Sequence, residues 1–208
     1  MRGLGILPME ISLAFCTLLH TFPITWAAIY HQLHPPASAE LGATMNELER
    51  ALTGDSAHAA PSHILEGLDG DIVHREIPGA PHTIYQELWH IVFWLRMSLN
   101  WISGVETPYP ARPTDPFPSD AVAAGEGWDE LRERFTREIQ EAAALTRNTD
   151  RLGQEVYCPS PPGAPGRTMT VQEQLESMAA HNAYHFGRIV LLRQLCGAWP
   201  PPSGGFTW

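Results

Sequence analysis

The sequence predicts an all-α protein, a four-helix bundle with long connections rich in proline and glycine. Apolar residues recur at spacings of three and four in separate segments, as they do on the buried face of an amphipathic helix. Stretches rich in proline and glycine separate these segments. No stretch alternates apolar and polar residues convincingly enough to predict a strand. A chain of 208 residues, 44% of them hydrophobic, is large enough to bury one such helical core.

The first two helices of the bundle are expected before residue 104. One helical segment covers residues 45–52 and resumes over 62–68, after a short Gly-Asp-Ser interruption. Residues 69–82 contain a Pro-Gly pair and are expected to form a loop. A long helix follows over residues 83–103. Gly104 is a suitable residue to end it, because glycine adopts the left-handed backbone conformation common just beyond a helix.

The remaining two helices are separated by irregular connections. Residues 105–125 contain five prolines and are expected to form a crossover loop. The third helix covers residues 127–147, with a charged face typical of contact with solvent. Residues 148–167 are expected to be irregular. The last helix runs from Thr170 to about Cys196, and Thr170 with Glu173 predicts a capping box at its start.

Residues 1–44 differ in composition from the rest of the chain. No charged residue occurs over residues 11–30, which are largely apolar. The favoured interpretation is upstream translation, with the natural start at Met45; a secretory signal cleaved near residues 37–39 comes second, and a membrane anchor last. The predicted organisation is an N-terminal extension over 1–44, the bundle over 45–199 and a flexible tail over 200–208.

Composition narrows the class of partner and the compartment. A net charge of −10 argues against nucleic-acid binding, which needs a basic surface. Every basic residue is arginine, a bias typical of a GC-rich bacterial genome. The widely spaced Cys16, Cys158 and Cys196 do not form a disulfide framework, so we expect free thiols and a cytoplasmic protein. No membrane contact is expected for residues 45–208.

Histidines on apolar helix faces point to a metal site. His181 and His185 lie one helical turn apart, on a face that also carries apolar residues and should point into the core. Two buried imidazoles cost free energy unless something binds them, and a shared metal ion would do so. His90 lies on the apolar stripe of the second helix and is the best candidate for a third ligand.

Three neutral imidazoles on one divalent ion match an open catalytic geometry, with room left for water or substrate. Zn, Ni, Co, Mn or Fe(II) would fit such a donor set. A fourth protein ligand, such as His58 or His63, would instead favour a structural ion. Glu87 and His90 form an E-x-x-H pattern, but His181 and His185 lack a matching glutamate, so a di-iron centre is not expected. Glu87 is expected beside the ligands or at the surface.

The residues around these histidines resemble a known family. The stretches Tyr85–Ile91 and His181–Gly187, followed by Ile189 and Leu192-Arg193, are similar to the DinB/YfiT-like superfamily, over roughly residues 45–199. The resemblance implies a four-helix bundle, often a homodimer, with His90, His181 and His185 as metal ligands. Residues 1–44 have no counterpart in the family pattern. Related families include thiol-cofactor S-transferases and a mycothiol-dependent isomerase, and many members are labelled metal-dependent hydrolases.

Two kinds of chemistry follow from such an ion. A metal-bound thiolate of a low-molecular-weight thiol could attack a small electrophile, or metal-bound water could hydrolyse an ester or amide. Hydrolysis usually needs a proton carrier, and beyond the ligands only Glu87 is near, so S-transfer is favoured over hydrolysis. A non-catalytic metal-binding or ligand-binding bundle is the third possibility.

The small-molecule substrate is expected in a cleft between the second and fourth helices. Trp94, Tyr184 and Arg188 are its candidate lining residues, with Glu87 nearby. Trp94 lies one turn after His90, so its ring should reach a bound molecule. Arg188 falls at the edge of the apolar stripe, and a surface position is the alternative for it.

Overall fold

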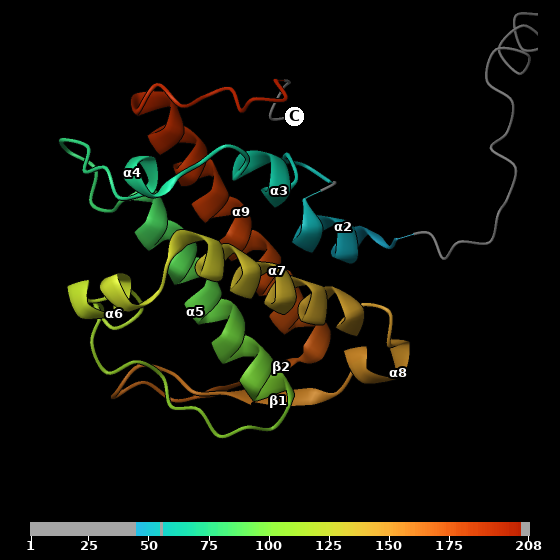
Figure 1. Ribbon diagram of the computed structural model, residues 1–208. Helices are drawn as coiled ribbons and strands as arrows, with labels where there is room; N and C mark the ends of the chain where they lie inside the picture. Colours follow the sequence, from blue (N-terminus) through green and yellow to red (C-terminus); the bar gives the residue numbers. More distant parts are fainter. Residues whose placement is uncertain (1–44, 55, 205–208) are drawn as a thin grey trace, which may run out of the picture. The chain divides into compact units, whose positions relative to one another are not determined.

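Four helices form a bundle in the computed structural model of the chain, which describes residues 45–54 and 56–204 (Figure 1). α5 packs against α9 and α7, and α2 packs against the same two helices, so that the four surround one core. This confirms the all-α four-helix bundle predicted from the sequence. The helices are α2 (Glu47–Thr53), α5 (Ile84–Ile102), α7 (Trp128–Leu145) and α9 (Val171–Leu195).

The two long helices that carry the histidines begin at side-chain caps. The Thr83 side chain accepts a hydrogen bond from the backbone amide of Gln86, whose own side chain accepts one from the Thr83 amide. Thr170 and Glu173 form the same reciprocal pair at the start of α9, as predicted. Each box satisfies amides that have no partner within the helix, and so fixes where the helix starts.

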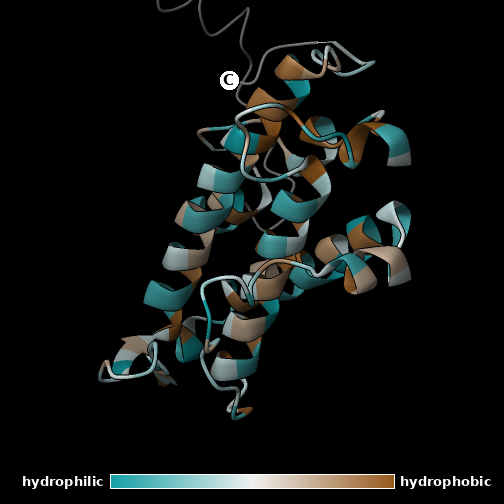
Figure 2. Cartoon of the chain, turned by 90° about the vertical axis from the view of Figure 1, so that its left-hand side faces the viewer, coloured by the Kyte–Doolittle hydropathy of each residue, from teal (hydrophilic) through white to brown (hydrophobic). Residues whose placement is uncertain are grey.

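Amphipathic helices build the core. Hydrophilic and hydrophobic segments alternate along the ribbons (Figure 2), because each helix turns one face to its neighbours and another to solvent. From α5, Leu88, Ile91 and Leu95 are fully buried, and Leu175 and Ile189 of α9 are buried with them. The α5–α9 contact is therefore an apolar interface, and the histidines are set into it.

The prediction of an irregular stretch over 148–167, and of no strand, was wrong. β1 (Glu155–Cys158) pairs with β2 (Arg167–Thr170) as an antiparallel hairpin, with Cys158 opposite Arg167. Each strand is only four residues long, and a Pro/Gly-rich connection separates them. Strands this short give almost no alternation to detect, and their stability comes from packing beside α9 and α5.

Short helices also interrupt the expected loops. The segment over 105–125 is not wholly a loop, because α6 (Asp120–Gly125) occupies its end, capped by the Ser119 side chain. The helix expected over 62–68 is shorter than predicted. Single-turn helices give no usable periodicity, which is why sequence patterns missed them. The others are α3 (Pro61–Ile64), α4 (Gly70–Val73) and α8 (Thr149–Leu152).

The interpretations offered for residues 1–44 fall outside the described residues and stay predictions. Of the tail expected over 200–208, the structure describes the chain as far as residue 204, where Pro201 is buried and the Ser203 amide donates to Glu66. Within the described residues, none of the helices combines the length and the apolar character that a membrane span needs.

Candidate metal centre

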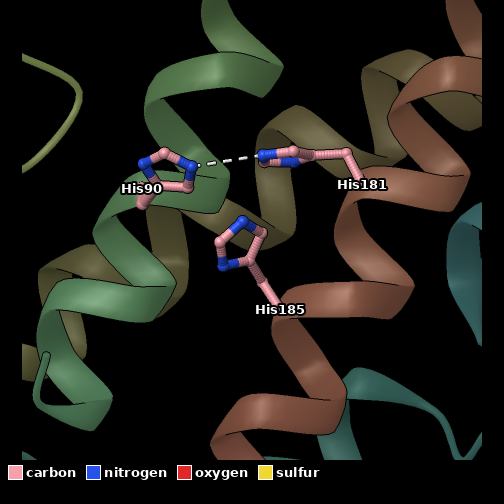
Figure 3. Close-up of side chains that lie close together, drawn as sticks. All are labelled: His90, His181 and His185. Atoms are coloured by element: carbon pink, nitrogen blue, oxygen red, sulfur yellow. Dashed lines mark hydrogen bonds between the residues drawn. The ribbon is translucent and has the colours of Figure 1, made fainter. Parts of the chain in front are cut away.

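Three imidazole rings converge between α5 and α9. His90 extends from α5, while His181 and His185 extend from successive turns of α9, and the three rings face a common centre (Figure 3). His90 and His185 are buried, and His181 is partly buried. The helical repeat explains this arrangement, because positions four apart on α9 share the face that α5 covers.

The spacing of the nitrogens suits a single ion. His90 Nε2 lies 3.2 Å from His181 Nε2, and each of the three residues offers a ligand atom within 4.8 Å of the other two. Two nitrogens bound tetrahedrally to one ion, at metal–nitrogen distances of about 2.0–2.1 Å, lie roughly 3.3 Å apart. His90, His181 and His185 could therefore hold a divalent metal with little rearrangement.

Hydrogen bonds behind two of the rings set their tautomers. His90 Nδ1 donates to the backbone carbonyl of Pro116 at 3.0 Å, and His185 Nδ1 donates to Glu87 Oε2 at 2.7 Å. In the neutral rings the Nε2 atoms then carry the free lone pairs. A partner on the far nitrogen of this kind orients a metal-binding histidine and raises its basicity. The donor set thus fits a metal ion in chemistry as well as in spacing.

The surroundings of His90 and His181 hold these two rings neutral. Burial, with a smaller contribution from the nearby His185, lowers the pKa of His90 from 6.5 to about 4. Burial likewise lowers the pKa of His181 to about 4, again with a contribution from His185. Both imidazoles are therefore unprotonated near neutral pH, the state in which they can bind a metal.

Glu87 is completely buried, and its carboxylate contacts two side chains of α9, His185 and Arg188. Its Oε1 lies 2.8 Å from an Arg188 guanidinium nitrogen, while Oε2 accepts from His185. Arg188 has 29% of its side chain exposed and also lies 3.4 Å from the hydroxyl of Tyr184. The alternatives left open by the sequence are thus placed: Glu87 lies behind a candidate ligand, and Arg188 is half-buried beside Glu87.

The proline-rich connection closes over His90, which the sequence did not suggest. Pro116 supplies the carbonyl that accepts from His90, and the Phe117 ring stacks on the imidazole with centroids 4.3 Å apart. The His82 ring also stacks on Phe117, with ring centroids 3.8 Å apart. A single aromatic residue in a predicted loop gives no periodic signal, so its position could not be inferred.

A cavity of about 480 Å³ adjoins the cluster at His181. Trp94 lines it, as expected from its position one turn after His90. Tyr184 and Arg188 are not among its lining residues, and Tyr184 is 62% exposed. The hairpin supplies one wall, which sequence reasoning missed because it predicted no strands there. The lining consists of Trp94, Leu95, Ser98, Trp101, Tyr109, Cys158, Pro159, Ser160, Pro161, Arg167, Gln174, Ser177, Met178, His181 and Asn182.

The two histidines considered as a fourth ligand lie elsewhere. His58 stacks against Phe186 with centroids 6.1 Å apart, and His63 lies within 3.2 Å of the Ser203 hydroxyl. Neither belongs to a cluster with the three rings among the described residues. The described part of the chain therefore offers three histidine ligands and leaves coordination positions for other molecules.

Comparison with known proteins identifies the family. The family model described as the DinB superfamily matches residues 43–189. This range includes all three clustered histidines and all four bundle helices, apart from the last turns of α9. The comparison with curated proteins found no match. Because the family model covers well over half of the chain, the protein belongs to the DinB superfamily.

Proposed function

We propose that this protein is a metal-dependent S-transferase that joins a low-molecular-weight thiol, through its sulfur, to a small electrophile. The observation that carries the proposal is the convergence of three imidazoles beside a cavity whose described lining residues include no carboxylate. His90, His181 and His185 would hold a divalent ion, whose Lewis acidity would keep a bound thiol deprotonated at neutral pH.

The groups around the cavity support thiol transfer more than hydrolysis. Hydrolysis by metal-bound water needs a nearby proton carrier. The carboxylate closest to the histidines, Glu87, is engaged by His185 and Arg188. In thiol transfer the sulfur–carbon bond forms while the carbon–leaving-group bond breaks with its electron pair on the leaving group. That step places no demand on a general base once the thiol has lost its proton.

The nucleophilic sulfur is expected from a small molecule rather than from the protein. Cys158 lines the cavity, but burial raises the pKa of its thiol, and its Sγ lies 3.3 Å from Gln174 Oε1 as a hydrogen-bond donor. A buried thiol of this kind is a poor source of thiolate at neutral pH. The cavity volume of about 480 Å³ lies within the range of small-molecule sites.

The test uses Co(II)-substituted protein and three thiols, namely cysteine, 2-mercaptoethanol and glutathione. At least one should add a sulfur-to-metal absorption band, and S-methylcysteine should not. The band should vanish in His181→Ala and persist in His63→Ala, a histidine outside the cluster. The thiol that gives the band should then react faster with monobromobimane, bromide leaving, only in the presence of metal and protein.

Hydrolysis is the second candidate. Glu87 would serve as its proton carrier if the carboxylate were released from His185 and Arg188. A Co(II) spectrum that no thiol changes, together with metal-dependent hydrolysis of p-nitrophenyl acetate, would replace the first proposal by this one. Absence of both activities in a protein that retains its metal would leave a non-catalytic metal-binding bundle.

A cytoplasmic location and a homodimer complete the proposal. Three exposed apolar residues of α9, namely Tyr184, Leu191 and Leu195, support self-association. They are spaced seven and four positions apart, so they share one face of the helix, and an exposed apolar face can mark a contact surface. Light scattering of purified protein tests the dimer, and fractionation of cells expressing the full chain tests the location.

A further inference from the structure

The cavity beside His181 has a charge that is unusual for this chain. The protein carries 23 acidic and 13 basic residues. Among the described residues that line the cavity there is no aspartate or glutamate, and Arg167 is the one arginine. The cavity therefore favours a negatively charged guest over a positively charged one.

Arg167 is available to such a guest. Its backbone is fixed in β2, where it pairs with Cys158 of β1. Its side chain forms no ion pair with an acidic residue in the part of the chain that the structure describes, whereas Arg96, Arg112, Arg134 and Arg147 each bind a carboxylate. A guanidinium presents paired donors that match the two oxygens of a carboxylate.

The aromatic residues of the lining suit a flat apolar body. Trp94, Trp101 and Tyr109 contribute aromatic rings, with Trp94 and Tyr109 centroids 5.2 Å apart. Trp101 is held by its indole N–H, which donates to the Thr107 carbonyl at 2.7 Å. Aromatic side chains fixed in this way offer faces for an aromatic or other planar guest.

A second donor lies deeper in the lining. Asn182 is only 2% exposed and follows His181 in the chain. Its amide nitrogen Nδ2 has no partner among the described residues. A buried donor without an acceptor is costly, and an oxygen atom of a bound molecule would remove that cost.

We infer that the cavity binds small carboxylates with an aromatic or planar apolar body, the carboxylate pairing with Arg167. This inference rests on the proposed function, because it takes the cavity as the place where the electrophile binds. It narrows the electrophilic substrate to small carboxylates with an aromatic or planar apolar body. The binding itself needs no metal, because Arg167 and the aromatic rings belong to the chain.

The probes are benzoate, phenylacetate and 3-phenylpropanoate, each compared with the primary alcohol of the same carbon skeleton. Binding is followed by quenching of tryptophan fluorescence and by calorimetry, in metal-free protein so that a carboxylate cannot simply ligate an ion. At least one carboxylate should bind about 10- to 100-fold more tightly than its alcohol, the factor expected from a charged hydrogen-bonded pair.

The variants test whether Arg167 causes the preference. Arg167→Gln should remove the difference between acid and alcohol, and Arg167→Lys should keep part of it. Arg137→Gln, at an exposed position on α7 outside the cavity, should bind like the parent. Equal binding of acids and alcohols, no saturable binding of any carboxylate, or equal losses in Arg167→Gln and Arg137→Gln would each overturn the inference.

These outcomes separate the inference from the proposed function. Carboxylate binding that depends on Arg167, in a protein whose Co(II) form gives no thiol band, would support the inference and contradict the thiol proposal. A thiol band without any preference for carboxylates would do the reverse.

Discussion

The Nδ1–H of His185 on α9 donates to Glu87 on α5 at 2.7 Å, although the carboxylate is completely buried. A buried carboxylate is costly unless donors or cations surround it, and His185 and Arg188 provide them. The pair links the two helices that carry the three histidines. It also fixes which nitrogen of His185 faces the cluster.

Replacing each clustered histidine tests the metal site directly. Purified protein should carry about one divalent ion per chain, as expected of a three-histidine site. His90→Ala, His181→Ala and His185→Ala should each lose most of it, measured by elemental analysis. His58→Ala and His63→Ala should retain the metal, because neither residue lies in the cluster. Full occupancy in all three cluster variants would refute the assignment.

Glu87→Gln tests the role of the buried carboxylate as a positioning residue. The amide keeps the size of the side chain but removes the charge that orients His185 and pairs with Arg188. Metal affinity, measured by competition with a chelator, should fall by about 10- to 100-fold. Glu141→Gln, which changes a solvent-exposed carboxylate on α7, is the matched control and should have the parent's affinity. Equal affinities in the two variants would show that Glu87 does not act through His185.

The low pKa values of His90 and His181 predict how stability depends on pH. Both lie at about 4 in the folded protein, below the ordinary value of 6.5 expected after unfolding. Between these values the unfolded chain binds more protons, so the free energy of unfolding of the metal-free protein should fall as the pH drops from about 6.5 to about 4. The stability that these two neutral rings contribute is fully present above a pH of about 6.5.

Urea unfolding at several pH values measures this dependence. In His90→Asn and His181→Asn the decline over the same window should be shallower than in the parent, because one titrating ring is gone. His74→Asn, at an exposed position outside the cluster, serves as the control. A decline of the same steepness in the parent and both cluster variants would mean that these rings are not the groups responsible.

The helical parts of the site could be predicted, and the parts contributed by connections could not. Spacing places His181 and His185 on one face, and the apolar stripe around His90 orients it towards them. Phe117 and Arg167 lie in segments whose path depends on tertiary packing. Nothing local indicates that Phe117 stacks on His90, or that the strand carrying Arg167 forms a cavity wall. Periodicity predicts faces of long helices, not the course of loops.

The interpretation of Met45 as the natural start has its own test. The bundle helices and the three histidines all lie within residues 45–204. A chain that begins at Met45 should therefore show helical circular dichroism, bind metal and have the same Tm as the full chain. Unfolding on truncation would contradict this prediction, and so would export of the full chain with cleavage near Ala39.

Arg193 provides a test of stability away from the metal site. It is 1% exposed, and its guanidinium donates to the backbone carbonyls of Ile64, Glu66 and Ala198. Its charge also lies over the Trp199 ring, 5.2 Å from the centroid. These bonds join α9 to the end of α3, to the segment just after α3 and to the chain beyond α9. Burial lowers the pKa of Arg193, but the hydrogen bonds compensate for much of the cost of burying the charge.

Arg193→Met should destabilise the protein, because the apolar side chain fills part of the space but leaves three carbonyls without their donors. Each unsatisfied buried acceptor costs about 1–3 kcal/mol, and partial access of water to the Glu66 and Ala198 carbonyls reduces the sum, so we expect a loss of about 3 kcal/mol in urea unfolding. Arg137→Met, an exposed arginine on α7, should change stability by less than about 0.5 kcal/mol. Metal content should be unchanged in both, since neither residue touches the histidine cluster. A loss below 1 kcal/mol in Arg193→Met would show that solvent already satisfies these carbonyls, roughly as it does at an exposed site.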